Sequence, residues 1–372
     1  MFSMMPFGFL FMSILIFGTV LSLSSLHWLS IWAGLEINLM GFIPILVYSG
    51  ASRETESGMK YFIMQALGSG MIMAGSLTSF SPLMTWEVTA TNLTWPGLLL
   101  LVFGMMLKLG SFPFHFWLPS VMAGISWLSC LILTTWQKLA PLFLLATLLL
   151  IYPENNFITG PFILLMASFS ALVGGLGGLN QTQIRALLAY SSIGHMGWML
   201  LCITVGGSAL KLYFFIYFIV SLCVFITLWA SEKSFFSQSG ISSLNNSKFN
   251  EITLMLMLLS LGGMPPLLGF FSKWVAIWFS SASQLTFPVF PLLLGSLVSL
   301  FYYLSLLFSL SLLSGTALTK AELLFIYPSS ELPTQVTSMV KTKFSRLTAT
   351  IFMLNLVGGI FMFLSLYVLE FI

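Results

Sequence analysis

The chain has 372 residues, of which 58% are hydrophobic and 6% are charged, and its formal net charge is +3. Soluble domains carry roughly 25% charged residues, so this composition excludes an ordinary water-soluble enzyme and predicts an all-α polytopic membrane protein. The small positive charge gives no indication of nucleic-acid binding.

Apolar windows of about twenty residues, separated by polar residues or by Gly and Pro, predict eleven transmembrane helices. The first is too long for the apolar core of a cleaved signal peptide, so we expect it to stay in the membrane. The joints are short, which predicts a single transmembrane domain over 1–372. The predicted helices are 2–23, 26–48, 59–80, 97–118, 124–150, 158–178, 183–204, 207–230, 251–282, 286–313 and 347–370.

Four ionisable residues lie well inside these predicted spans, away from the span ends: Glu36, Lys108, Lys138 and Lys273. Each costs about 2.5–3.5 kcal/mol at the centre of a membrane, so their presence indicates a function that needs a buried charge. The alternatives are snorkelling to the interface or a purely structural ion pair. Snorkelling is hardest for Glu36 and Lys138, because both lie near the middle of their spans.

The fourth and ninth spans contain the same helix-breaking pattern, LKLGSFP at 107–113 and LSLGGMP at 259–265. Proline removes a backbone donor, so each break frees carbonyls that must meet water or polar side chains. Paired breaks in two halves of a chain are typical of inverted-repeat transporters, although leucine-rich segments also match by chance. We therefore expect broken helices near 107–113 and 259–266, which is compatible with two half-channels in series.

The two long connections, 231–250 and 314–346, are rich in Ser, Lys and Glu, and we expect both to be water-facing loops. With eleven spans, the basic residues of the joints gather on the N-terminal side, and only Lys211 falls on the other. Because Lys and Arg favour the cytoplasmic or matrix side, we expect the N-terminus there and the C-terminus opposite. The basic residues on the N-terminal side are Arg53, Lys60, Arg185, Lys233, Lys248, Lys320, Lys341, Lys343 and Arg346.

Neither a metal site nor a nucleotide site is predicted. Cys130, Cys202 and Cys223 lie in apolar runs without CxxC spacing, so we expect packing residues and not metal ligands. The glycine-rich segment 172–181 lies within a predicted span and does not follow a strand, which argues against a nicotinamide fingerprint.

Six blocks lie between about residues 36 and 274 and read EINLMGFIPIL, KYFIMQALGSG, FPFHFWLP, GISWLSCLILTTWQKLAP, LNQTQIRALLAYSSIGHMGW and SLGGMPPLLGFFSKW. In this order they resemble the subunit 2 family of mitochondrial NADH:ubiquinone oxidoreductase, respiratory complex I. The resemblance is weaker over 281–372. The eleven-span count is similar to the shortened animal form, which lacks three N-terminal helices of the bacterial relatives.

The resemblance implies a core proton-translocating, antiporter-like subunit in the membrane arm of a mitochondrial inner-membrane complex, with its N-terminus in the matrix and its C-terminus toward the intermembrane space. The family's buried polar axis of one glutamate and several lysines falls here on Glu36, Lys108, Lys138 and Lys273, the four residues chosen by burial cost. His115 and His195 match family motifs and are candidates for a proton relay, because histidine titrates near neutrality. Packing or interfacial hydrogen bonding is the alternative for each histidine.

The resemblance also implies a mechanism. A lysine in a dry site releases its proton more readily, and a nearby carboxylate restores the charged form. Glu36 would modulate Lys108 as an ion pair, Lys138 would be the central proton carrier, and Lys273 would exchange protons with the far side. Quinone reduction elsewhere in the NADH:ubiquinone reductase would supply the energy.

The implied partners are other membrane-arm subunits, including neighbouring antiporter-like subunits, accessory subunits and phospholipids, and no nucleic acid. NADH, FMN, iron–sulfur clusters and ubiquinone would bind elsewhere in the complex, with no cofactor on this chain. Three residues depart from the family pattern: Ser120 replaces an acid, Ala186 a basic residue, and Ser272 a proline. These departures bear on loop contacts more than on the axis.

Two other functions remain open. A free-standing cation/proton antiporter would share the broken helices and the buried lysines, but not the six blocks. A non-pumping scaffold of the membrane arm would use the buried charges as structural pairs.

Overall fold

The computed structural model is built from α-helices. In the described part of the chain no β-sheet forms, and strand-like contacts are limited to isolated bridges such as the one between His27 and Glu87. The described residues are 7–48, 50–78, 86–88, 95–151, 156–231, 246–265, 267–324, 349–350 and 352–359. The helices are α1 (Gly8–Ser24), α2 (Trp28–Val47), α3 (Ser52–Leu77), α4 (Trp95–Leu109), α5 (Trp117–Gly124), α6 (Trp127–Thr134), α7 (Trp136–Ile151), α8 (Asn156–Gly178), α9 (Ile184–Val205), α10 (Gly207–Ser231), α11 (Asn246–Gly262), α12 (Leu268–Ala282) and α13 (Val289–Leu324), and residues 352–359 add a short helical segment.

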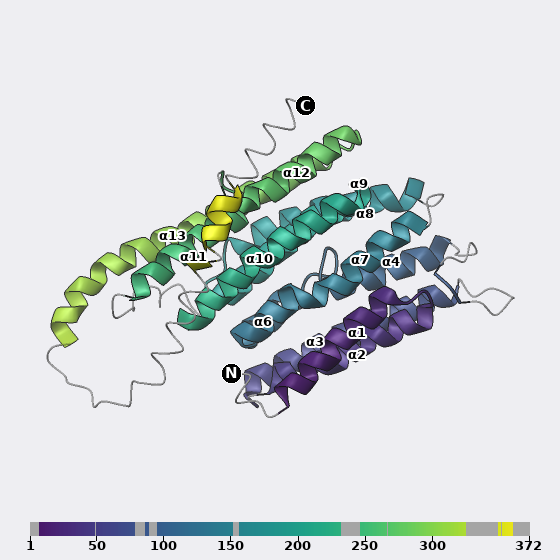
Figure 1. The fold of residues 1–372 in the computed structure, drawn as a ribbon, viewed down its shortest axis with the longest axis horizontal. Helices are drawn as coiled ribbons and strands as arrows, with labels where there is room; N and C mark the ends of the chain where they lie inside the picture. The colour runs from purple at the N-terminus through teal and green to yellow at the C-terminus, as the bar shows by residue number, and fades with distance from the viewer. Residues whose placement is uncertain are drawn as a thin grey trace.

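The helices lie side by side with their long axes roughly aligned (Figure 1). α1, α2 and α3 form one edge of the bundle, α8, α9 and α10 lie in the middle, and α11, α12 and α13 form the opposite edge. α9 is the central helix, because 89% of its most apolar window is buried, whereas the corresponding window of α13 is 28% buried. The middle of the bundle is therefore where side chains from both edges meet.

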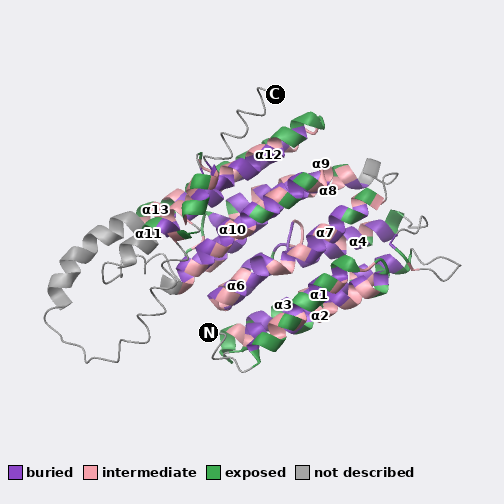
Figure 2. Ribbon diagram, viewed as in Figure 1, coloured by how far each residue is buried: buried purple, intermediate pink, exposed green. Residues whose placement is uncertain are grey.

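The surface of this bundle is suited to lipid. Buried residues lie between the helices and exposed residues on their outward sides (Figure 2). The exposed side chains include large apolar groups such as Phe9 and Phe287, which are 87% and 90% exposed. Water disfavours such a surface, whereas the hydrocarbon core of a bilayer requires it. The chain is a multi-pass membrane protein. Within the described residues, six segments are long and apolar enough to cross a membrane by length and composition: Trp28–Val47, Trp127–Ile151, Thr159–Gly178, Ile184–Val205, Gly207–Trp229 and Val289–Ser309.

Two spans leave helical geometry where the sequence predicts an interruption. In the first, α4 ends at Leu109 and α5 begins at Trp117. In the second, α11 ends at Gly262 and α12 begins at Leu268. Each break therefore consists of two half-helices joined by a short irregular segment.

The predicted fifth span, 124–150, contains a break that the sequence interpretation missed. α6 ends at Thr134 and α7 begins at Trp136, so Thr135 stands between two helices. Its hydroxyl donates to the Leu131 carbonyl at 2.6 Å, and the Thr134 hydroxyl donates to the Cys130 carbonyl at 3.0 Å. Threonine hydroxyls that bond to the preceding turn bend helices, which accounts for a junction here.

Several predicted boundaries also need correction. The segments 246–250 and 314–324, expected in loops, are helical parts of α11 and α13. α13 has 36 residues, a length of about 54 Å that exceeds the membrane core of about 30 Å. The rest of the predicted loops, 232–245 and 325–346, and most of the predicted last helix lie outside the described residues.

Candidate functional site

The first break begins with a glycine turn that closes the end of α4. Gly110 has a φ of +69°, a conformation that costs a residue with a side chain about 1–2 kcal/mol. Its N–H donates to the Leu107 carbonyl at 3.2 Å, and the Ser111 N–H donates to the Met106 carbonyl at 3.2 Å. This pair of bonds is the Schellman pattern, which satisfies carbonyls that the helix end leaves free.

Side chains from neighbouring helices add two hydrogen bonds at this end of α4, one of them to a carbonyl that already accepts from the glycine turn. Trp117, the first residue of α5, donates its indole N–H to the Leu107 carbonyl at 3.2 Å. Gln65 of α3 donates its amide to the Lys108 carbonyl at 3.4 Å. The backbone of the first break is therefore held by α3 and α5 together.

The second break begins with the same turn. Gly263 has a φ of +81°, its N–H donates to the Ser260 carbonyl at 3.0 Å, and the Met264 N–H donates to the Leu259 carbonyl at 3.1 Å. The sequence pattern aligns Gly110 with Gly262, but the structure makes Gly263 the equivalent of Gly110. The two motifs are therefore related with a shift of one residue.

Lys108 lies in the last turn of α4 and is 6% exposed. An ammonium near a helix C-terminus is favoured by the helix dipole. Its stem packs against α3 at Gly68, where an added Cβ would come within 3.1 Å of the Lys108 Cγ. The close approach of α3 therefore determines where this lysine lies.

Glu36 of α2 is within electrostatic range of Lys108 and of the Tyr61 hydroxyl. The expected ion pair with Lys108 does not form: among the described residues the N–O contact within 4.0 Å is Lys60 with Glu56. One carboxylate oxygen of Glu36 is buried without a hydrogen-bond partner among the described residues. The structure thus places Glu36 and Lys108 as neighbours that interact at longer range and without a contact ion pair, and the modulating role of Glu36 stays a prediction.

Lys138 lies three residues after the Thr135 junction, in the first turn of α7, and is 2% exposed. Its ammonium donates to the Ser192 carbonyl of α9 at 3.4 Å and lies 6.0 Å from the centre of the Tyr217 ring of α10. No carboxylate among the described residues pairs with it. This buried amine is therefore held by neutral groups alone.

Lys273 of α12 reaches back across the second break. Its ammonium donates to the carbonyl of Gly262, the last residue of α11, at 2.8 Å, and the residue is 8% exposed. A lysine at a helix C-terminus satisfies a free carbonyl and complements the dipole. An added Cβ at Gly263 would come within 2.9 Å of this ammonium, so glycine is required both for the turn and for the lysine.

His195 of α9 lies near the two later lysines. It lines a pocket together with Lys273, and Ser192, one turn earlier on α9, accepts a hydrogen bond from Lys138. His195 is within electrostatic range of both Lys138 and Lys273, and its Nδ1 lies 2.9 Å from the Tyr213 hydroxyl of α10. The structure thus brings His195 together with two of the predicted lysines.

A small pocket beside His195 and Lys273 has room on the order of a single water molecule. Tyr302 and Tyr303 of α13 line it, and their buried hydroxyls make no well-formed hydrogen bond among the described residues, although they lie near one another and near serine hydroxyls. The pocket therefore gathers polar groups from three helices.

His115 lies in the first break and has different surroundings. Its Nδ1 lies 3.2 Å from the Pro113 carbonyl, and its ring packs 4.0 Å from the centre of the Phe116 ring. None of its described contacts joins it to the buried lysines. The structure therefore supports the packing alternative for His115 more than a relay.

Sequence reasoning missed the neutral partners of the lysines. Tyr213 and Tyr217 are spaced by four in an apolar span, which places both on one face of α10 and was a usable signal. Gln137, beside Lys138, donates its amide to Asn38 at 3.1 Å and so ties α7 to α2 near Glu36. This polar pair inside predicted spans was a second signal.

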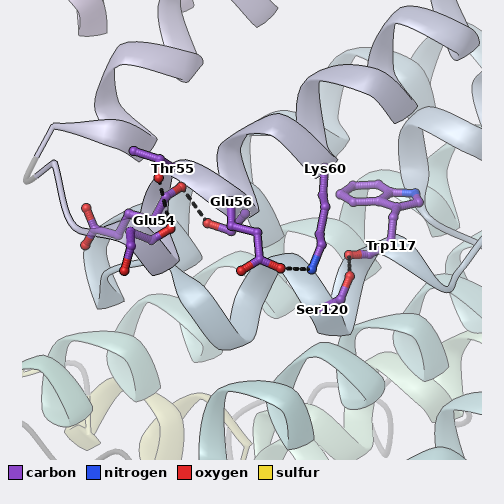
Figure 3. A network of polar contacts seen from close by, with 8 residues as sticks. Glu54, Thr55, Glu56, Lys60, Trp117 and Ser120 are labelled. Atoms are coloured by element: carbon purple, nitrogen blue, oxygen red, sulfur yellow. Dashed lines mark hydrogen bonds and ion pairs between the residues drawn. The ribbon is translucent and has the colours of Figure 1, made fainter.

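Ser120, which departs from the family pattern, donates its hydroxyl to the Trp117 carbonyl of its own helix at 2.9 Å. Nearby on α3, Lys60 pairs with Glu56 at 2.6 Å (Figure 3). Glu56 precedes the predicted span and is exposed, and its hydrogen bond with Lys60 lowers the pKa of its carboxyl. An exposed pair of this kind adds little stability, so it does not explain the buried charges.

No cluster of three or more His, Cys, Asp or Glu side chains suited to a metal occurs in the described ranges. The three cysteines are buried and unpaired there. The absence of a cofactor on this chain stays a prediction.

Comparisons with known proteins add a family to this geometry. Residues 25–301 match the family model described as NADH:quinone oxidoreductase/Mrp antiporter, TM. The NADH-ubiquinone oxidoreductase chain 2 of Lumbricus terrestris is 43% identical over 300 residues, which cover 80% of this chain and 85% of the relative. The protein of the same name from Squalus acanthias is 36% identical over 343 residues, covering 91% and 96%.

Solved structures show the same fold. A chain of respiratory complex I from Thermus thermophilus superposes with a TM-score of 0.75 at 23% identity, covering 95% of this chain and 79% of that chain. A chain of the Mrp complex from a Dietzia species gives a TM-score of 0.72 at 17% identity, covering 80% and 59%. The chain therefore has the antiporter-like membrane fold, and it belongs to the NADH:quinone oxidoreductase/Mrp antiporter transmembrane family, among relatives named NADH-ubiquinone oxidoreductase chain 2.

Proposed function

We propose that this chain is a core proton-translocating subunit in the membrane arm of respiratory complex I. One observation carries the proposal: Lys138 is 2% exposed, and its ammonium meets a carbonyl and no carboxylate among the described residues. A structural ion pair needs a partner of opposite charge, whereas a proton carrier needs a site where the charged and neutral forms are both accessible. The surroundings of Lys138 fit the second requirement.

The proposed path follows the described contacts. Glu36 and Lys108 interact at longer range near the first break, and the Gln137–Asn38 hydrogen bond ties α2 to α7 beside Lys138. From Lys138 the path continues to His195 and then to Lys273. His195 supports this order because it lies within electrostatic range of both lysines.

Charge coupling between neighbours would move the protons. A proton that leaves one lysine lowers the local positive potential, and the next lysine then holds its own proton more firmly. Because Glu36 and Lys108 interact at the first break, a change there would alter the distribution of charge among Lys108, Lys138 and Lys273. Energy would come from NADH:ubiquinone electron transfer on other subunits, which hold NADH, FMN, iron–sulfur clusters and ubiquinone.

The proposed setting is the mitochondrial inner membrane. We infer eleven spans in one domain, an inverted repeat around the two breaks, and the loss of three helices relative to bacterial forms. The N-terminus and the long joints would face the matrix, and neighbouring antiporter-like subunits, accessory subunits and phospholipids would surround the chain. The relatives named NADH-ubiquinone oxidoreductase chain 2 favour this assembly over a free-standing antiporter.

Two substitutions at one position test the proposal in the assembled complex. Lys138→Met keeps much of the side-chain volume and removes the proton, and Lys138→Arg keeps a charge that does not leave. Both are expected to lower coupled quinone reduction and pumping together by about tenfold or more, with normal subunit levels. Lys211 is exposed on α10, so Lys211→Met and Lys211→Arg are the matched controls and are expected to behave as wild type.

Two results would contradict the carrier role. Wild-type pumping by the Lys138→Arg complex would remove Lys138 from the path. Loss of assembly as the main defect of Lys138→Met would mean that a partner charge had been stranded, at a cost of about 3–5 kcal/mol, and would favour the scaffold alternative.

A further inference from the structure

The start of α12 has no cap of its own. Leu267, at the N-cap position, has an apolar side chain that makes no capping hydrogen bond. The N–H of Leu268 instead donates to the side-chain oxygen of Asn355 at 3.1 Å. A helix N-terminus leaves its first N–H groups unpaired, so this contact is an N-cap supplied by a residue 87 positions later.

The same carboxamide also contacts the other half of the broken helix. The Asn355 amide nitrogen lies 3.0 Å from the sulfur of Met257 in α11, and the residue is 1% exposed. One turn later, an added Cβ at Gly358 would lie 3.0 Å from the Leu268 side chain, so the backbone of 352–359 packs directly on α12. Asn355 therefore contacts both half-helices of the second break from a third segment, residues 352–359.

The position of Lys273 depends on how α12 sits against α11. Lys273 follows Leu268 by five residues in α12, and its ammonium reaches the carbonyl of Gly262 in α11 at 2.8 Å. The two half-helices approach so closely that an added Cβ at Gly269 would collide with the Ser260 carbonyl. A small displacement of the first turn of α12 would therefore change the contact between Lys273 and Gly262.

The first break is held differently. Its own Trp117 and the neighbouring Gln65 donate to the last carbonyls of α4, and both come from helices that precede or complete that break. In the second break, the side chain of α12 whose described hydrogen bond reaches the last carbonyl of α11 is Lys273 itself. Asn355 links the two half-helices of the second break, as Trp117 links those of the first.

We propose that Asn355 is a positioning residue for Lys273: by capping α12 and contacting α11, it sets the distance at which the lysine meets the Gly262 carbonyl. The proposal rests on the proposed role of Lys273 in proton transfer. Asn355 itself carries no proton. Residues 352–359 therefore hold α11 and α12 at the spacing that lets Lys273 reach the Gly262 carbonyl.

The test compares Asn355→Leu with Asn355→Asp in the assembled complex. Leucine has a similar size and removes the cap, whereas aspartate keeps an oxygen acceptor and adds a charge that a helix N-terminus favours. We expect Asn355→Leu to lower turnover and pumping together by about three- to tenfold, with an unchanged KM for quinone and normal subunit levels. We expect Asn355→Asp to stay within about twofold of wild type.

Hydrogen exchange gives a second measurement that does not depend on activity. The peptide that covers the first turn of α12 should exchange about tenfold faster in Asn355→Leu and at close to the wild-type rate in Asn355→Asp. Leu354 is 58% exposed on the same short segment, so Leu354→Ala is the matched control and should change neither quantity. If Asn355→Leu fails to assemble, the smaller change Asn355→Ala, which also removes the carboxamide oxygen that caps α12, should still speed exchange at the first turn of α12, and wild-type exchange in Asn355→Ala would overturn the inference.

The outcomes separate this inference from the proposed function. Wild-type turnover and exchange in Asn355→Leu, together with lost pumping in Lys273→Met, would overturn the role of Asn355 and leave the role of Lys273 intact. Wild-type pumping in Lys273→Met would overturn both. Equal defects in Asn355→Leu and Asn355→Asp would also overturn the inference, because the cap would then not be the property that matters.

Discussion

Two adjacent glycines at the end of α11 have unequal roles. Gly263 has a positive φ and lies against the Lys273 ammonium, whereas an added Cβ at Gly262 would find its nearest neighbour, the Tyr303 ring, at an ordinary 3.4 Å. An alanine methyl group at position 263 would therefore disturb both the turn and Lys273, whereas the same group at position 262 would disturb neither.

At this scale we predict that Gly263→Ala impairs the second break and Gly262→Ala does not. The strained conformation alone costs about 1–2 kcal/mol, and the methyl group also displaces the Lys273 ammonium. Subunit levels and coupled quinone reduction should both fall in Gly263→Ala. Near-normal activity in Gly263→Ala, or equal losses in the two variants, would show that Lys273 does not depend on this turn.

At the scale of the helices, the junction between α6 and α7 determines which way Lys138 faces. The Thr135 hydroxyl donates a hydrogen bond to the Leu131 carbonyl at 2.6 Å, and α7 begins at Trp136. Lys138 then lies in the first turn of a new helix, opposite the Ser192 carbonyl of α9. The bend therefore helps to place an amine at the centre of the bundle.

We predict that Thr135→Val lowers turnover by about two- to fivefold, because valine has the same shape and keeps the backbone bond to the Leu131 carbonyl but lacks the hydroxyl bond to it. Thr147 lies in α7 and makes the same kind of bond, to the Leu144 carbonyl at 2.8 Å, away from the junction. Thr147→Val is the control and should be near neutral. The measurement is turnover at matched subunit levels. Equal effects of Thr135→Val and Thr147→Val would show that the α6–α7 junction does not determine the position of Lys138.

The sequence predicts the helices and the buried charges well because both follow from the cost of polar groups in lipid. That cost singles out Lys138 and Lys273 without any structure. It does not reveal that Lys138 meets Ser192 or that α12 is capped by Asn355, because neutral partners from distant helices leave no spacing pattern. The pattern LSLGGMP likewise does not indicate which glycine forms the turn, since that depends on the packing of Lys273.

At the scale of the whole molecule, the distribution of basic residues predicts how the chain sits in the membrane. Lys341 and Lys343, in a predicted loop outside the described residues, should react with an impermeant amine label only from the matrix side. Lys211, exposed at the start of α10, should react only from the intermembrane side. Labelling of Lys341 or Lys343 from outside the inner membrane of intact mitochondria would contradict the predicted orientation.

The bond from Leu268 to Asn355 also has a consequence for biosynthesis. Because the cap follows the helix by 87 residues, α12 is synthesised before its partner. The first break, by contrast, has Gln65 and Trp117 available as soon as α5 emerges. The two halves of the molecule therefore mature at different times, and a ribosome that stops short of residue 355 releases a chain whose first break has all its contacts and whose second break lacks its cap.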